Sequence, residues 1–211
     1  MSVIPILASS LNRRDDTPNQ ALADKIIRSK RTDWVKELVE NLKNSDKNIQ
    51  SDCMKVLYEI GERGAAELIA PYEEEFAQML TSRNNRLVWG AMTALDTIAD
   101  LNPGGIIRKL PQILEAIDEG SVITIDHGVS ILAKLARIEK YAKKVFPLLL
   151  KQLQRCPAKQ LPMYAEKSIM AISAANKNQF ITLLKDRFAE LQHASQKKRI
   201  EKIIKHYSHA T

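Results

Sequence analysis

The sequence has few of the residues that favour turns, strands and disulfide frameworks. Its 211 residues include only 7 Gly, 8 Pro and 2 Cys, and aromatic residues make up 5%. Few Gly and Pro residues argue against a fold of many short strands joined by tight turns. With only two cysteines there is no disulfide framework, so we expect Cys53 and Cys156 to be buried free thiols. Because aromatic residues are scarce, aliphatic side chains and alanine must build the core.

The sequence also lacks long apolar runs and recognisable cofactor motifs. No run approaches the roughly 20 residues that a membrane-spanning helix needs. The apolar residues 1–7 are few and have no basic lead, so they do not resemble a signal peptide. No Gly-rich phosphate loop, nucleotide fingerprint or zinc-ligand cluster is present. These absences predict a cytoplasmic protein with no membrane span, no cofactor and no metal.

What the sequence does contain is helical periodicity. The chain is 45% hydrophobic and 27% charged, which is typical of globular proteins. After an irregular lead over residues 1–16, apolar residues recur at helical spacing in stretches of 10–18 residues. Short polar breaks separate these stretches, and none is long enough to be a domain linker. We therefore expect an all-α protein with a single domain over residues 17–211.

Small residues recur along the chain, each followed four and seven positions later by large aliphatic residues. The small residues are Cys53, Ala91, Gly128 and Ala165, in steps of 38, 37 and 37 residues. The aliphatic pairs that follow them are Leu57 and Ile60, Leu95 and Ile98, Leu132 and Leu135, and Ile169 and Ile172. A small residue lets a neighbouring helix approach closely, and the large residues fill the seam. This repeat predicts about five stacked helical hairpins, because one hairpin cannot bury its apolar face alone.

A second register lies between these helices and carries a family resemblance. A proline stands next to an apolar or aromatic residue in Pro71-Tyr72, Leu110-Pro111 and Phe146-Pro147, and each pair is expected to open an apolar helical stretch. Together with Arg86-Leu87-Val88-Trp89-Gly90-Ala91, these segments resemble the first and second helices of HEAT repeats. The resemblance covers roughly residues 33–175, and weakly extends to residue 208, and it implies a right-handed α-α superhelix, a HEAT-like solenoid. The repeat is shorter than the roughly 40–47 residues usual for HEAT and armadillo repeats, and Asn48, Ile123 and Gln160 stand where that family often has Arg.

The resemblance also implies a binding surface, because second helices line the concave face of such arrays. Exposed positions of the expected second helices would then form a site for a protein or peptide partner. Its candidate residues are Arg86, Trp89, Asp126, His127, Lys134, Tyr164 and Lys167. Exposed Trp and Tyr beside charges are typical of interfaces. The alternative is that Trp89 and Tyr164 pack between helices.

Catalytic and metal-binding readings of the same residues are weaker. Asp126 and His127 are adjacent on a helix and point about 100° apart, so they do not form a dyad by themselves. Some HEAT-like proteins excise alkylated DNA bases with concave aromatic residues and an Asp, for which Trp89, Asp126 and Tyr164 would be nearest here. The surrounding sequence does not match that family. His193, His206 and His209 lack further ligands for a metal.

Charge is unevenly distributed along the chain. Residues 1–105 carry 13 Lys and Arg against 16 Asp and Glu, whereas residues 106–211 carry 19 against 9. Residues 197–205 form a basic amphipathic helix that would cap the solenoid, with its lysines facing solvent. The alternative is contact with the phosphate backbone of a nucleic acid. The candidate contacts are Lys143, Lys144, Lys197, Lys198, Arg199, Lys202 and Lys205.

These patterns favour a non-catalytic scaffold that binds a protein or peptide, with nucleic-acid binding by the basic C-terminal half as the alternative.

Overall fold

The structure is a computed structural model that describes residues 2–209, and side chains as far as residue 208. All regular secondary structure in this range is helical, which confirms the all-α prediction. The α-helices are α1 (Thr17–Ser29), α2 (Thr32–Glu40), α3 (Lys47–Ile60), α4 (Glu73–Met79), α5 (Asn85–Ile98), α6 (Pro103–Arg108), α7 (Leu110–Glu119), α8 (Val122–Ala136), α9 (Glu139–Arg155), α10 (Leu161–Ser168), α11 (Lys177–Asp186) and α12 (Ala194–His209). Short 3₁₀ and π turns occupy several of the connections.

The chain divides into two compact units, Met1–Gly128 and Val129–Thr211. The boundary falls within α8, so the first half of this helix belongs to the first unit and the second half to the second. Each unit is described by itself below.

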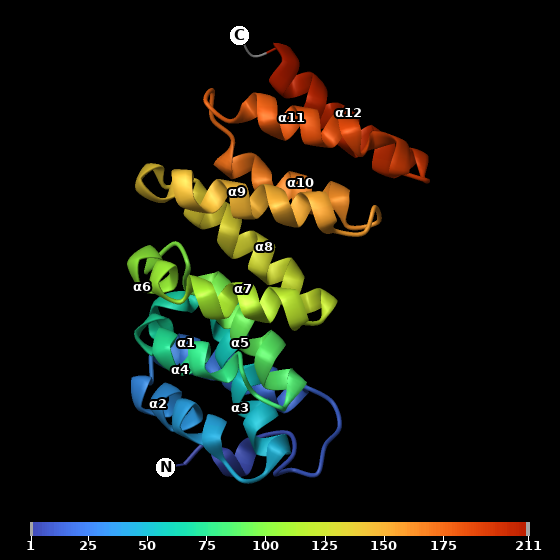
Figure 1. Ribbon diagram of the computed structural model, residues 1–211. Helices are drawn as coiled ribbons and strands as arrows, with labels where there is room; N and C mark the ends of the chain where they lie inside the picture. The colour runs from blue at the N-terminus through green and yellow to red at the C-terminus, as the bar shows by residue number, and fades with distance from the viewer. Residues whose placement is uncertain (1, 210–211) are drawn as a thin grey trace. The chain divides into compact units, whose positions relative to one another are not determined.

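In the first unit, consecutive helices form hairpins that lie against one another. Helix α2 packs on α3, and α4 packs on α5, while α3 and α5 pack directly together (Figure 1). Helix α1 covers a further face of α3. The aliphatic residues predicted to fill the seams do so on α3 and α5: Leu57, Ile60, Leu95 and Ile98 are all fully buried. The hairpin register predicted from the sequence therefore describes the packing of this unit.

Helix starts follow the same spacing as the small residues. Helices α3, α5 and α8 begin at Lys47, Asn85 and Val122, each six residues before the small residue of its repeat. Gly90, next to Ala91, lies so close to α3 that a Cβ atom there would be 2.4 Å from Met54 Cγ. At Gly128 a Cβ atom would be 2.3 Å from Ile117 Cγ1 of α7. Small residues at these positions therefore permit the close approach of neighbouring helices.

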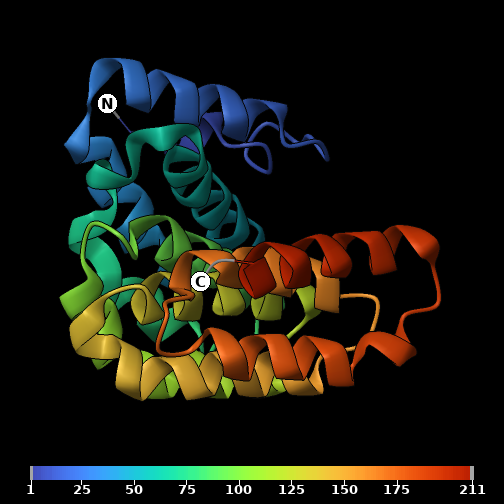
Figure 2. The same ribbon diagram turned by 90° about the horizontal axis from the view of Figure 1, so that it is seen from above.

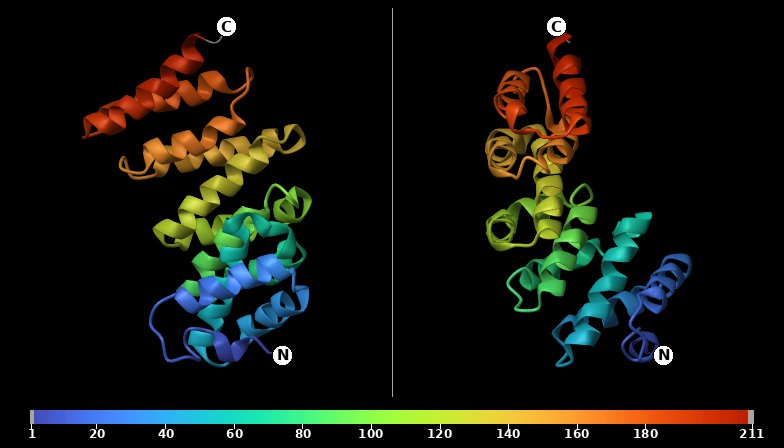
Figure 3. Two further views of the ribbon diagram at one scale, coloured as in Figure 1. Left: turned by 180° about the vertical axis from the view of Figure 1, so that it is seen from behind. Right: turned by 90° about the vertical axis from the view of Figure 1, so that its right-hand side faces the viewer.

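The second unit repeats this arrangement with two antiparallel hairpins, α9–α10 and α11–α12. Helix α11 lies against α9 and α12 lies against α10, so that the hairpins stack in series within the unit (Figures 2 and 3). The buried side chains Phe180, Leu184 and Ile200 form its core together with Leu149 and Leu153.

Two details of the predicted repeat are wrong in the second unit. Ile169 was expected to fill a seam but is 38% exposed, because α10 ends at Ser168 and the chain turns into a 3₁₀ segment. The Ser168 hydroxyl donates to the Tyr164 carbonyl oxygen at 2.7 Å at this end of the helix. Pro147 lies inside α9 rather than at the start of a helix, whereas Pro111 does lie in the first turn of α7.

The N-terminal lead, which holds one short 3₁₀ turn, is anchored to the first unit. Residues Ile4–Ile6 form a 3₁₀ turn, and Leu7 is fully buried. Asn19 of α1, which is also fully buried, accepts a hydrogen bond from the Ala8 amide (3.0 Å) and donates to Asp52 Oδ1 (2.8 Å). The other oxygen of Asp52 accepts from the Ser9 amide at 2.7 Å. A buried polar network therefore holds the lead against α3.

No helix between residues 2 and 209 is both long and apolar enough to cross a membrane.

Candidate functional site

The N-terminal ends of α3 and α5 are fixed by capping side chains. Asp46 accepts a hydrogen bond from the amide two residues later (2.7 Å), and Asn84 does the same at the start of α5 (3.2 Å). The Asn84 side-chain amide also donates to Ser51 Oγ of α3 at 3.2 Å. This contact ties the start of α5 to α3 and so positions the side chains of both first turns.

Beside these helix starts lies a cleft that the lead closes on one side. It consists of two cavities of about 360 and 580 Å³ that share five lining residues. We call it the lead cleft. The residues common to both cavities are Arg14, Asp15, Asp16, Asp52 and Arg86. The smaller cavity adds Ser51, Lys55, Tyr58 and Trp89, and the larger adds Ala8, Ser9, Asn12, Arg13 and Asn48.

An aromatic pair forms one wall of the lead cleft. The rings of Tyr58 and Trp89 are tilted by 57° with centroids 5.4 Å apart, which is within the usual distance for an aromatic pair. Tyr58 is buried, whereas Trp89 is partly exposed. The Lys55 ammonium lies 4.8 Å from the centroid of the Tyr58 ring. The wall thus offers a rigid aromatic surface with part of the indole accessible.

Lys55 also belongs to an ion-pair network at the edge of the cleft. Its Nζ is 2.6 Å from Glu59 and 3.6 Å from Asp16, and Glu59 also accepts from Arg63 Nε at 2.8 Å. Burial raises the pKa of the Glu59 carboxyl, but hydrogen bonds from Lys55 and Arg63 outweigh it, so this pKa is lowered. Burial by itself lowers the pKa of Lys55, and the hydrogen bonds to Glu59 and Tyr58 raise it overall. Both groups are therefore charged at neutral pH.

The carboxylates of the lead cleft already have partners. Arg13 holds Asp15 through two hydrogen bonds of 2.9 and 3.0 Å, and the Thr17 amide donates to the same carboxylate. Hydrogen bonds from Thr17 and Arg13 lower the pKa of Asp15 to about 2. Asp52 accepts from Ser9 and Asn19, as described above.

Of the predicted partner-binding residues, the structure brings Arg86 and Trp89 together in this cleft. Asp126 and His127 lie on the first half of α8, in the same unit but outside the lining of the cleft. His127 Nδ1 lies 2.8 Å from Asp96 Oδ2 of α5, and both side chains are mostly buried. His127 thus pairs with an Asp from the preceding repeat, a contact that no sequence pattern indicated.

The remaining predicted partner-binding residues belong to the second unit. Lys134 and Lys167 are partly exposed. Tyr164 is only 1% exposed, so the expectation of an accessible aromatic ring at this position is corrected. Tyr164 stands one position before Ala165, as Gly90 stands before Ala91, and both of these positions are buried. The burial of Tyr164 agrees with the alternative prediction that this ring packs between helices.

The predicted nucleic-acid contacts also lie in the second unit. Lys143 and Lys144 are exposed on α9, and Lys198, Lys202 and Lys205 are exposed on α12. Lys197 is partly exposed. Arg199 binds Glu166 of α10 through hydrogen bonds of 2.7 and 2.5 Å. Ile200 and Ile203 are buried, so α12 covers α10 and α11 with its apolar side, as a capping helix does.

Sequence reasoning missed the contribution of the lead. Arg14, Asp15 and Asp16 were assigned to an irregular segment, and nothing in their spacing places them beside α3 and α5. The run of charges at Arg13, Arg14, Asp15 and Asp16 was the only available signal. Tyr58 was missed because it follows Leu57 directly and was not part of the small-residue register.

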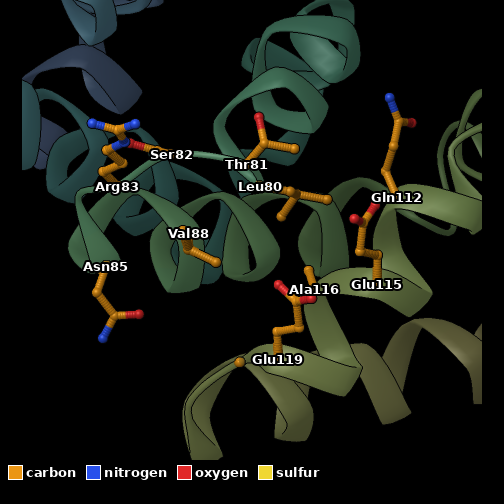
Figure 4. Close-up of a pocket in the computed structure, with 11 residues that line it drawn as sticks. Leu80, Thr81, Ser82, Arg83, Asn85, Val88, Gln112, Glu115, Ala116 and Glu119 are labelled. Atoms are coloured by element: carbon orange, nitrogen blue, oxygen red, sulfur yellow. The ribbon is translucent and has the colours of Figure 1, made fainter.

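A further cavity of about 310 Å³ lies between the α4–α5 connection and α7 (Figure 4). Leu80, Val88 and Ala116 supply apolar surface, and Arg83 and Asn85 lie across from Gln112, Glu115 and Glu119. None of these residues was predicted to be functional. The cavity contains two acidic side chains one helical turn apart, Glu115 and Glu119.

Among the described residues there is no group of three or more His, Cys, Asp or Glu side chains that could hold a metal ion. His193 and His206 are exposed, and the side chain of His209 lies outside the described residues. Cys53 and Cys156 are buried free thiols, as predicted, and burial raises the pKa of Cys53 to about 12.

Comparisons with known proteins identify similar folds only. No family model matches the chain, and no curated protein matches its sequence. Two crystal structures of engineered proteins from the Northeast Structural Genomics Consortium are similar, with TM-scores of 0.66 and 0.63 and sequence identities of 17% and 16%. The similarity covers 98% of this chain and 99% of the first protein, and 99% and 97% for the second. A third engineered protein has a TM-score of 0.61 and 17% identity over 97% of this chain and 58% of its own.

Proposed function

We propose that this chain is a non-catalytic helical-repeat scaffold that binds a protein or peptide partner in the lead cleft of its first unit. The observation that carries the proposal is the placement of Arg86 and Trp89, two predicted contact residues, in one cleft with Tyr58 and Lys55. Tyr, Trp and Arg are the residues that dominate binding energy at protein interfaces. Tyr58 is buried and its ring contacts Trp89, so this aromatic pair needs little ordering when a partner binds.

The proposal assigns no catalytic role to the residues that line the cleft. Asp15 already accepts hydrogen bonds from Arg13, Asp52 already accepts one from the Ser9 amide, and Lys55 is held by Glu59. We also propose that the hairpins of the two units belong to one HEAT-like array. The support for this is the constant repeat spacing of the sequence, which continues through residues 128 and 165.

Substitution of Trp89 tests the proposed function. Binders would be selected from a random peptide library against the intact chain, and their affinity measured by calorimetry. Trp89→Ala is expected to weaken cleft binders about 30-fold, as for an interface residue worth about 2 kcal/mol. Leu101→Ala is the control, because Leu101 is a large exposed apolar residue outside the cleft.

Because Trp89 also packs on Tyr58, the exposed Arg86→Ala variant serves as a second probe, and thermal unfolding establishes that both variants fold. Peptides whose affinity changes with neither variant would contradict the proposed site.

A second candidate function rests on the charge of the second unit. Residues 129–211 carry 17 Lys and Arg against 5 Asp and Glu, a net charge of +12, whereas residues 1–128 carry 15 against 20. Lys198, Lys202 and Lys205 are exposed along one side of α12. Such a surface attracts a phosphate backbone.

The salt dependence of DNA binding tests this second candidate. If three phosphates are contacted, a fourfold rise in salt should weaken binding about 40-fold. The triple variant Lys198→Gln, Lys202→Gln and Lys205→Gln should bind more weakly and depend less on salt. Absence of a mobility shift at low salt would eliminate this candidate.

A further inference from the structure

Two arginines of the lead cleft differ from its other charged groups. Arg14 and Arg86 are exposed and line both cavities of the cleft. Within residues 2–209, no hydrogen bond or ion pair engages either guanidinium group, whereas Arg13 is bound to Asp15 and Lys55 to Glu59. The two arginines come from distant segments, the lead and the start of α5, and the fold brings them to one cavity.

The nearby carboxylates do not neutralise these arginines because other groups already bind them. Asp15 accepts from Arg13 and Thr17, and Asp52 accepts from Ser9 and Asn19. Asp16 lies 3.6 Å from Lys55 Nζ. The donors of Arg14 and Arg86 therefore remain available to an acceptor that enters from outside, and a guanidinium group binds a carboxylate through two parallel hydrogen bonds.

The overall charge of the lining indicates how much negative charge the cleft accepts. Its cationic side chains are Arg13, Arg14, Lys55 and Arg86, and its anionic side chains are Asp15, Asp16 and Asp52. The excess is one positive charge, which a single carboxylate neutralises. A phosphate group carries nearly two negative charges and would exceed this single positive charge.

The wall formed by Trp89 and Tyr58 adds an apolar requirement beside the arginines. Trp89 and Arg86 are three residues apart on α5, so their side chains lie on the same side of the helix. An acidic residue held at Arg86 would place a neighbouring residue of the same segment against the indole.

From these contacts we propose that the lead cleft recognises an acidic peptide segment. A partner Asp or Glu carboxylate binds between Arg14 and Arg86, and an adjacent apolar side chain packs on Trp89. This assignment rests on the proposed scaffold function and specifies the chemistry of its partner.

The experiment uses the same random peptide library selected against the intact chain. Binders are expected to share an Asp or Glu next to an apolar residue. In the tightest peptide, replacing that acidic residue with Gln or Asn should weaken binding by about 10- to 100-fold, as expected for charge-assisted hydrogen bonds. Arg14→Gln and Arg86→Gln should each lower the affinity for the original acidic peptide. In the variant that carries both substitutions, the acidic peptide and its neutral counterpart should bind with the same affinity.

Two control variants separate this cleft from general electrostatic attraction. Arg28→Gln removes one exposed positive charge of the first unit outside the cleft and should change affinity less than about threefold. The triple α12 variant tests whether acidic peptides bind instead to the basic second unit, and it too should leave affinity nearly unchanged.

The outcomes separate the two proposals. Binders that depend on Trp89 but show no acidic preference, and no response to Arg14→Gln or Arg86→Gln, would overturn the acidic-peptide assignment and leave the scaffold function standing. A phosphoserine peptide that binds more tightly than its Glu counterpart would overturn the choice of a carboxylate. Failure to select any binder that depends on Trp89 or Arg86 would overturn both proposals.

Discussion

Glu59 is a mostly buried carboxylate of α3 that forms ion pairs with Lys55 and Arg63 in the first unit. Its side chain is mostly buried next to the lead cleft, and both of its oxygens are bound, one by Lys55 and the other by Arg63. A buried carboxylate of this kind is stabilised only while both cations remain in place. Arg63 in turn reaches Asp24 of α1 at 2.6 Å, so that Glu59 helps to join α1 and α3.

The stability of the protein is therefore expected to depend on the ionisation of Glu59. Because the pKa of Glu59 is lowered in the folded state, its stabilising contribution is present above the unfolded pKa of about 4.3 and is lost as pH falls through the folded pKa. Glu59→Gln should lower the free energy of unfolding by about 1–3 kcal/mol at neutral pH and by less in acid. Urea unfolding at both pH values measures the difference.

The matched control for Glu59 is Glu62→Gln, a change at an exposed glutamate just beyond the end of α3. It should alter stability by less than about 0.5 kcal/mol at either pH. An equal loss for Glu59→Gln at neutral and acidic pH would show that hydrogen bonding rather than charge accounts for its contribution.

At the scale of elements, the start of α5 depends on one asparagine with two roles. The Asn84 carbonyl oxygen caps the helix, and its amide group donates to Ser51 of α3. Because the cap and the contact between helices use different atoms of one side chain, substitutions can separate them. The position of Arg86 and Trp89 depends on both.

Asn84→Ala should lower the free energy of unfolding by about 1–2 kcal/mol, because the cap and the contact to α3 are both lost. Asn84→Asp keeps the capping oxygen and loses only the donor, so its effect should be clearly smaller. Chemical denaturation of both variants provides the comparison, with exposed Asn85→Ala as a control. If the Asp variant is as unstable as the Ala variant, the contact to Ser51 dominates over the cap.

At the scale of the whole molecule, the repeat spacing makes a prediction about size in solution. A compact globule of 211 residues has a radius of gyration of about 17 Å. If the hairpins form one continuous HEAT-like array, as proposed, the molecule should be more extended than this. Small-angle X-ray scattering measures the radius directly, and a value at or below that of a globule would contradict the proposed array.

The sequence alone determined the helices and much of their packing register. A buried helix needs apolar residues at helical spacing, and close helix packing needs small residues, so Cys53, Ala91 and Gly128 could be recognised from local patterns. The same reasoning wrongly predicted a buried Ile169, because the apolar pattern does not show that α10 ends one residue earlier, at Ser168. Arg86 and Trp89 were found as exposed positions of a recurring helix.

Only the tertiary structure decided which distant residues meet. The lead is held to α3 by Asn19 and Asp52, and His127 pairs with Asp96, through contacts between segments that no periodicity relates. Tyr164 was misjudged because its exposure depends on what the neighbouring helices cover. Periodicity reports which side of a helix is apolar, whereas a cleft arises where separate elements converge, and this convergence brings Arg14 and Arg86 into the lining of the same cavities.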